Sequence, residues 1–254
     1  SNVDADAIID HIIKHQDTIS HIHLNGGEPF MMPEVYKMLD KLIQHDLHKP
    51  GGIGIWCHTN GSIRTYKGED IVEKYLSKWE DRFQITMSHD GCGPRGEYIR
   101  YGYKDKKWLE TYNRFREAGC RVNIQHCLNI FNILHQKECL NWYISNVYSC
   151  NFNFFFTHWG GLFSLSHIKH IPMLYNQVIS ELQECLDICN QDSRLEAQVK
   201  EYEKILLRVE NIVTDPLLPH LHFVKAINKF DEMRNTDFHK IFPELKPFWD
   251  FCNV

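Results

Sequence analysis

The chain has 254 residues, which is enough for one large domain or for a domain with a smaller appendage. Its composition, with 43% hydrophobic and 24% charged residues, is typical of a globular protein with a packed core. The net charge of −5 argues against a general nucleic-acid binder, and no stretch resembles a signal peptide or a membrane span, so we expect a soluble cytoplasmic protein.

Short apolar runs alternate with amphipathic stretches through the first two thirds of the chain. An amphipathic stretch follows Ser1-Asn2 directly and predicts a first helix. Five apolar runs predict strands, and the first four lead into clusters of small and polar residues. In chain order these runs are residues 22–24, 53–57, 83–87, 122–128 and 152–157.

The stretches between the runs have the apolar period of helices, and Pro33 suits a first helical position. The apolar residues at helical spacing are Val35, Met38, Leu39 and Leu42, then Ile71, Tyr75 and Leu76, then Leu109, Tyr112 and Phe115. Alternating strands and helices indicate an α/β fold with a parallel sheet, either open or closed into a partial or complete barrel. We assign this unit to residues 1–165.

The pattern becomes helical in residues 166–254, which we expect to form a C-terminal extension. Residues 175–189 and 195–209 each carry one apolar stripe, and Ser193 to Glu196 has the form of a capping box. Thr214-Asp215-Pro216 predicts the start of a further short helix. The last forty residues, rich in Phe and Pro, predict irregular structure.

The chain contains nine cysteines at irregular spacings and no Cys-x-x-Cys pair. An odd number in this arrangement argues against a disulfide framework. Cys185 and Cys189 stand four residues apart on one helix face, where a metal clip is conceivable. We interpret them as small buried residues, because free Cys buries readily.

Polar clusters lie at the carboxyl ends of the predicted strands, where parallel α/β sheets bind their ligands. Gly26-Gly27 allows a sharp turn and a close approach of peptide groups to a ligand. Glu28 adds a carboxylate, and Pro29 stiffens the exit from the turn. Taken alone, these four residues also describe an ordinary strand-to-helix turn.

Taken in order, the clusters resemble the series on successive strands of radical S-adenosylmethionine barrels. The series is Gly-Gly-Glu-Pro at 26–29, Thr-Asn-Gly-Ser at 59–62, Ser-His-Asp-Gly at 88–91, then Arg100 and Asn129. Residues 233–238 and 242–245 resemble the end of the subgroup that contains a twitch domain. The resemblance covers most of the chain and implies an incomplete (β/α) partial barrel with a mainly helical C-terminal extension.

The resemblance also implies roles for individual residues. The loop Gly26, Gly27, Glu28 and Pro29 would contact the amino group of S-adenosylmethionine, with Glu28 as the acceptor. Asn60 and Ser62 would lie close to the cofactor, and Ser88 and Asp90 would face the ribose hydroxyls. Arg100 would pair with the methionine carboxylate, and Asn129 would lie near the adenine or ribose.

The reaction implied for the intact parent is reductive cleavage of S-adenosylmethionine by a 4Fe-4S cluster. The resulting 5′-deoxyadenosyl radical would abstract hydrogen from a substrate, and a peptide, a nucleotide or a sugar would each fit. No catalytic residue follows from the resemblance.

The sequence departs from the family at the cluster. Family members hold it through Cys-x-x-x-Cys-x-x-Cys upstream of Gly-Gly-Glu-Pro, and none of the 25 residues before Gly26 is Cys. We therefore expect no metal in this chain and no reductive cleavage by it alone. The expectation is a truncated protein, a split gene or a degenerate relative.

An alternative from another class is a metal-dependent hydrolase barrel, because the chain has 16 histidines. Those at or near predicted strand ends are His21, His23, His58, His89, His126 and His158. Against this reading, histidines are common throughout the chain, and no late strand supplies an aspartate base.

A second alternative is a non-catalytic binding module for single-stranded nucleic acid or an acidic peptide. It depends on basic residues that interleave with aromatic ones in residues 95–108. These are Arg95, Arg100, Lys104, Lys106 and Lys107, with Tyr98, Tyr101, Tyr103 and Trp108. The same pattern fits a solvated loop that leads into a helix.

Overall fold

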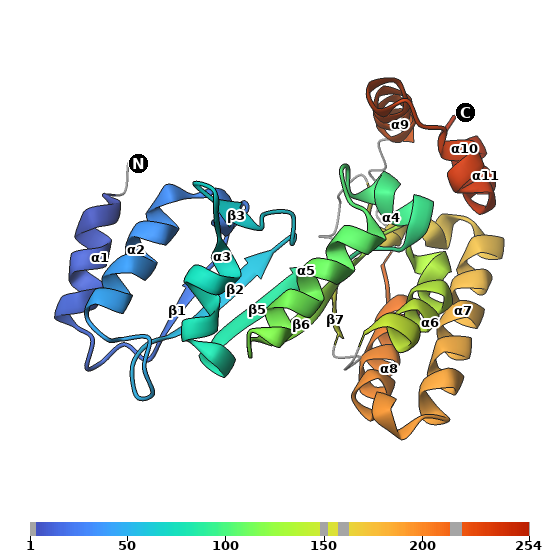
Figure 1. Ribbon diagram of the computed structural model, residues 1–254. Helices are drawn as coiled ribbons and strands as arrows, with labels where there is room; N and C mark the ends of the chain where they lie inside the picture. Colours follow the sequence, from blue (N-terminus) through green and yellow to red (C-terminus); the bar gives the residue numbers. More distant parts are fainter. Residues whose placement is uncertain (1–3, 148–151, 157–162, 214–219, 254) are drawn as a thin grey trace. The chain divides into compact units, whose positions relative to one another are not determined.

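The computed structural model describes residues 4–147, 152–156, 163–213 and 220–253. The chain has an α/β fold around a sheet of five strands in the order β1-β2-β5-β6-β7 (Figure 1). Their bounds are β1 His21–Leu24, β2 Gly54–Thr59, β5 Phe83–Ser88, β6 Arg121–Leu128 and β7 Phe152–Phe156. All five predicted strands are therefore present, and Thr157 and His158 lie outside the described residues.

The chain divides into two compact units, each described here by itself. The first unit comprises Ser1–Ser88 with Lys106–Ile124, and the second comprises His89–Asp105 with Gln125–Val254. The predicted division after residue 165 stays a prediction. Among the described residues that follow β7, every regular element is helical.

In the first unit the strands run parallel. The register pairs Leu24 of β1 with Cys57 of β2, and Thr59 of β2 with Met87 of β5. One face of these strands is fully buried, with Ile55, Cys57, Ile85 and Met87 all at 0% exposure. Because the strands are parallel, their carboxyl ends lie at one edge, and the loops that follow them share that edge.

Helices of the first unit cover the buried face. They are α1 Ala5–Lys14, α2 Pro33–Gln44, α3 Ile71–Lys74 and α5 Asp105–Glu117. Helices α1 and α2 lie side by side (Figure 1). The predicted stripe of α2 is confirmed, because Val35, Met38, Leu39 and Leu42 are all buried. Phe30 contacts both Phe83 of β5 and Phe115 of α5, which joins sheet and helix.

The predicted helix around residue 75 is interrupted. Helix α3 ends at Lys74, and two 3-10 turns follow, Leu76–Lys78 and Glu80–Arg82. Trp79 is buried between them and donates its indole N–H to the Ile53 carbonyl at 3.0 Å. This anchor bends the chain away from the helical path.

A hairpin of β3 Thr65–Tyr66 and β4 Glu69–Asp70, which the apolar pattern did not predict, turns at Gly68 with a positive φ of 82°.

The second unit is mainly helical. Its helices are α4 Gly93–Ile99, α6 Gln136–Asn146, α7 Pro172–Asn190, α8 Glu196–Glu210, α9 His220–Arg234, α10 Phe238–Ile241 and α11 Lys246–Cys252. Helices α7 and α8 lie side by side (Figure 1) and carry the two predicted stripes. No helix in the described ranges is both long enough and apolar enough to span a membrane.

Two local predictions for the second unit are wrong. The capping box is absent, because Asp192 rather than Ser193 caps the 3-10 turn Ser193–Leu195, accepting from the Arg194 N–H. The last forty residues are not irregular but contain α9, α10 and α11. Their phenylalanines form a core rather than loops, with the rings of Phe223 and Phe248 4.8 Å apart. Thr214-Asp215-Pro216 lies outside the described residues.

The cysteines behave as small apolar residues. Of the cysteines in the described ranges, all are free, and only Cys127 is not buried. Cys185 and Cys189 are 0% and 2% exposed on the inner face of α7. Their predicted burial is thus confirmed.

Candidate functional site

The first predicted loop makes a turn that only glycine adopts easily. Gly26 and Gly27 follow β1 with φ angles of +95° and +49°. A Cβ built on either residue would meet no atom within 4 Å, and both residues are exposed. The turn therefore leaves open space beside both glycines, as the close approach of a ligand requires, while the Gly26 N–H donates to Asn25 Oδ1 at 3.0 Å.

Glu28 joins this loop to the one that follows β2. Its carboxylate accepts from the Thr59 hydroxyl at 2.7 Å and from the Asn60 backbone N–H at 2.8 Å. It also caps the short turn Pro29–Met31, accepting from the Phe30 N–H at 3.4 Å. Glu28 is 9% exposed, so in this structure both of its oxygens serve the protein itself.

The loop after β2 is held by a hydrogen bond from its own backbone to the side chain of Asn60. Asn60 accepts from the Ser62 N–H at 2.7 Å through its Oδ1, an arrangement typical of Asn in turns. Gly61 between them has a φ of +73°. Both Asn60 and Ser62 are exposed. At the end of β5, the Ser88 carbonyl accepts from the Trp108 indole N–H at 3.0 Å.

We predict that Glu28→Gln lowers the free energy of unfolding by about 1–2 kcal/mol, because an amide cannot accept from both donors as the carboxylate does. Urea denaturation at neutral pH measures it. Glu34→Gln, at an exposed position in the first turn of α2, serves as the control and should change stability by less than about 0.5 kcal/mol. Equal losses in the two variants would contradict the linking role of Glu28.

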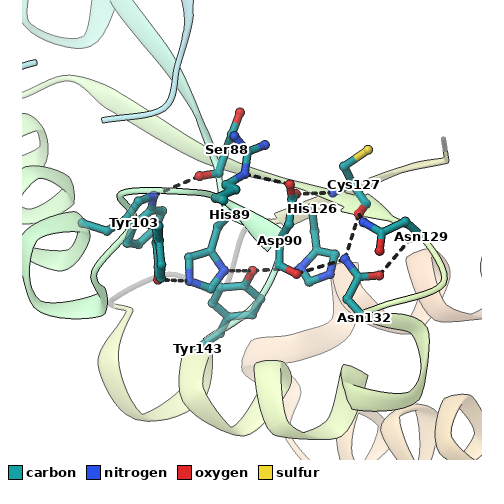
Figure 2. A network of polar contacts seen from close by, with 11 residues as sticks. Ser88, His89, Asp90, Tyr103, His126, Cys127, Asn129, Asn132 and Tyr143 are labelled. Carbon is teal, nitrogen blue, oxygen red and sulfur yellow. Dashed lines mark hydrogen bonds and ion pairs between the residues drawn. The ribbon is translucent and has the colours of Figure 1, made fainter. Parts of the chain in front are cut away.

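In the second unit, Asp90 is the centre of a second group of contacts (Figure 2). It is 6% exposed. One carboxylate oxygen accepts from Arg100 Nε at 2.7 Å, and the other accepts from the Cys127 N–H at 2.8 Å. Within the described part of the chain, Nε is the only side-chain nitrogen of Arg100 with a protein acceptor. Since the Arg100 side chain is 32% exposed, its two terminal nitrogens can still donate to a ligand.

Two asparagines shape the loop after β6. Asn129 accepts from the Phe131 N–H at 2.9 Å and donates to the Cys127 carbonyl at 3.1 Å. Asn132 accepts from the Asn129 N–H and donates to the carbonyls of Asp90 and Cys127, at 2.9, 2.9 and 2.8 Å (Figure 2). Asn132 was missed in the sequence, although the pair Asn-x-x-Asn directly after a strand was a usable signal.

The predicted site residues thus form one group in each unit. Glu28 holds the Asn60 loop in the first unit, and Asp90 holds Arg100 in the second. Asn129 is 6% exposed and bonds within its own loop.

A chain of buried hydrogen bonds adjoins Asp90 (Figure 2). His89 bonds the hydroxyl of Tyr103 through Nε2 and that of Tyr143 through Nδ1, both at 2.7 Å. The Tyr143 hydroxyl also lies 3.1 Å from Nδ1 of His126. Burial lowers the pKa of His89 well below its usual value and that of His126 to about 4, so both rings are neutral at pH 7.

The histidines in the described ranges, which leave out His158, do not converge as the hydrolase alternative requires. His89 and His126 bond to tyrosines, while His23 stacks on Trp56 at 4.9 Å. In the described ranges, no three His, Cys, Asp or Glu side chains converge as metal ligands. The same observation shows that these residues do not fit an iron–sulfur cluster, which needs several thiolates at one place.

The basic stretch of the binding-module alternative is largely paired. Arg95 bonds Glu138 at 2.9 Å, Arg100 bonds Asp90 at 2.7 Å, and Lys104 bonds Glu97 at 2.5 Å. Tyr98 and Trp108 are each 2% exposed. These cations therefore face carboxylates of the protein, which lowers the positive potential that a nucleic acid would meet.

Comparison with known proteins supplies independent findings. The family model described as "Radical SAM superfamily" matches residues 1–139. The structure described as "Native anSMEcpe with bound AdoMet and Cp18Cys peptide" matches with a TM-score of 0.53 and 16% identity, over 74% of this chain and 51% of the other. "Native anSMEcpe with bound AdoMet" matches with a TM-score of 0.51 and 15% identity, over the same shares. The chain spans about half the length of these structures, and no curated protein matches the sequence.

Proposed function

The chain belongs to the radical SAM superfamily (SAM, S-adenosylmethionine), and from this premise we propose that its strand-end loops bind and orient SAM within a radical enzyme. The observation that carries the proposal is the turn at Gly26 and Gly27. Both glycines are exposed with open space beside them, and the neighbouring loop is fixed to the turn through Glu28. A preformed turn of this kind binds a polar ligand without having to be ordered first.

The proposed cofactor residues divide by chemistry. Gly26, Gly27 and Pro29 shape the turn that receives the amino group, and Glu28 places a negative charge beside it. Arg100, held through Nε by Asp90, offers a forked donor for the methionine carboxylate. The residues proposed to lie around the rest of SAM are Asn60, Ser62, Ser88, Asp90 and Asn129.

A cluster would supply the electron that cleaves SAM in the intact parent. The 254 residues contain no Cys-x-x-x-Cys-x-x-Cys, and the described residues offer no substitute set of ligands. The part of the reaction that these residues can perform is therefore to bind SAM, orient it and exclude water. We do not expect this chain alone to cleave SAM reductively.

For the intact parent we propose the family reaction, in which a 5′-deoxyadenosyl radical abstracts hydrogen from a small molecule or a peptide. We further propose that residues 1–165 form a partial barrel of the twitch-domain subgroup and that residues 166–254 form its helical extension. Support comes from the parallel strands of the first unit and from the helices that follow β7.

SAM titration into the isotopically labelled chain, followed by amide resonances, tests the site. We predict weak binding, with a Kd of about 1 mM, because no cluster chelates the ligand here. Resonances of Gly26, Gly27 and Asn60 should shift. Gly26→Val places a side chain over the turn and should weaken binding by about tenfold or more, which corresponds to roughly 1.4 kcal/mol.

Gly68→Val is the matched control. Gly68 also has a positive φ, +82°, and open space around its Cα, but lies in the β3–β4 turn. Backbone strain should lower the free energy of unfolding of both variants by about 1–2 kcal/mol. Only Gly26→Val should bind SAM more weakly. Shifts confined to other regions, or equal losses of binding in both variants, would exclude the proposed site.

A further inference from the structure

Four buried side chains and the half-buried Tyr103 form a continuous hydrogen-bond relay in the second unit. The relay consists of Gln136, His126, Tyr143, His89 and Tyr103, and Figure 2 shows the last four of these. Its consecutive contacts measure 3.3, 3.1, 2.7 and 2.7 Å. Gln136, His126 and His89 are 0% exposed and Tyr143 is 1% exposed, so water does not compete with the bonds among these four residues.

The direction of donation is set at the Gln136 end. Gln136 Nε2 lies 2.8 Å from the carbonyl oxygen of Asn132, which can only accept, so the amide nitrogen must face it. The second hydrogen of the same nitrogen is directed toward Nε2 of His126. That ring nitrogen must accept, and a neutral His126 therefore carries its proton on Nδ1.

The same reasoning passes along the relay one residue at a time. His126 donates from Nδ1 to the Tyr143 oxygen, so the single hydroxyl proton of Tyr143 goes to Nδ1 of His89. His89 then carries its own proton on Nε2 and donates it to the Tyr103 oxygen. Burial raises the pKa of Tyr103, and the neighbouring Asp105 carboxylate raises it further, so Tyr103 keeps a proton to direct away from His89.

The relay is suited to holding position rather than to conducting protons. It ends on the amide of Gln136, which neither gives up nor takes a proton near neutral pH. It does connect elements that surround Asp90. His89 directly follows β5, and its backbone N–H donates to the Gln125 carbonyl of β6 at 2.9 Å, while Gln136 and Tyr143 belong to α6.

We propose that this one-way relay fixes His126 as the Nδ1–H tautomer and His89 as the Nε2–H tautomer, and that it thereby positions the His89–Asp90 segment. Tyr143, which bonds both rings, is the central positioning residue. The relay would also fix how the Asp90 and Arg100 side chains are oriented toward bound SAM, and this consequence rests on the proposed function. The tautomers themselves do not, because they are set by protein contacts alone.

Two-bond ¹⁵N–¹H correlations of the histidine rings in the whole chain test the proposal without any ligand. Replacement of each histidine by Gln in separate samples assigns the two ring systems. At neutral pH we expect a single tautomer for each ring, protonated on Nδ1 in His126 and on Nε2 in His89. A proton on the opposite nitrogen of either ring, or a mixture in either ring, overturns the relay.

Variants at the two ends separate a relay from independent pairs. Gln136→Met removes one end, and Tyr103→Phe removes the other. Because the direction is set at the Gln136 end, in a relay Gln136→Met should mix the tautomers of both rings, whereas Tyr103→Phe should keep both. Independent pairs would instead mix only the tautomers of His126 in the first variant and those of His89 in the second. That result, or unchanged tautomers in Gln136→Met, would refute the proposal.

Discussion

Asp90→Ala is expected to lower the free energy of unfolding by about 3 kcal/mol, because it removes one partner of a largely buried charge pair and leaves the other unpaired. Arg100 Nε and the Cys127 N–H would both lose their acceptor. The Arg100 side chain is one third exposed, so water can solvate its unpaired charge in the variant. The expected loss of stability therefore lies at the lower end of the range for buried pairs. Urea denaturation at pH 7 measures the change.

Asp81→Ala provides the matched control for this prediction. Asp81 bonds Arg121 at 2.9 Å, but both side chains are 63% exposed. Exposed pairs contribute little, so this variant should lose less than about 1 kcal/mol. Asp90→Asn keeps the shape and should lose less than Asp90→Ala. If Asp90→Ala were no worse than Asp81→Ala, the structural role assigned to Asp90 would be wrong.

Acidification from about pH 7.5 to about pH 5 is expected to remove about 2 kcal/mol of stability through His126 alone. Burial lowers the pKa of His126 to about 4 in the folded chain, against its usual value of 6.5. The unfolded chain therefore takes up protons first, and stability that is complete above pH 6.5 is lost as the pH falls toward 4. His89, whose pKa is also lowered by burial, adds to the loss in the same direction.

The dependence of unfolding free energy on pH, measured by urea titration across this window, checks the prediction. His126→Gln removes the buried imidazole and should flatten the slope, although it lowers stability at neutral pH. His45→Gln, at an exposed position, should leave the slope unchanged. A slope that is the same in all three proteins would show that buried histidines do not control acid stability here.

Strand positions could be predicted from sequence because each strand is short, apolar and followed by a polar cluster. The loops after β1, β2 and β6 therefore lay where they were expected. The partners of their side chains could not be predicted. Glu28 has the same chemistry whether it faces a ligand or the Asn60 N–H, and only the folded loops decide between them. Asn129 likewise fits a ligand contact and a local turn equally well in sequence.

The relay was beyond prediction for a different reason. Its residues come from the end of β5, the middle of β6, the Tyr103 loop and α6, and nothing in their spacing connects them. The misjudged C-terminal tail has a simpler cause. Frequent Pro and Phe predict irregular chain, whereas Pro247 stands in the first turn of α11 and Phe248 packs into the core.

The burial of Cys57, Cys120 and Cys185 makes these three thiols slow to react with electrophiles while the chain is folded. Burial raises the pKa of Cys57 and Cys185, and that of Cys120 to about 12, so almost no thiolate exists at neutral pH. Alkylation would then proceed only through local opening. Cys57 and Cys120 lie in the first unit and Cys185 in the second. The order in which these thiols react with an alkylating reagent would therefore report which unit opens first, and no residue would have to be replaced to introduce a label.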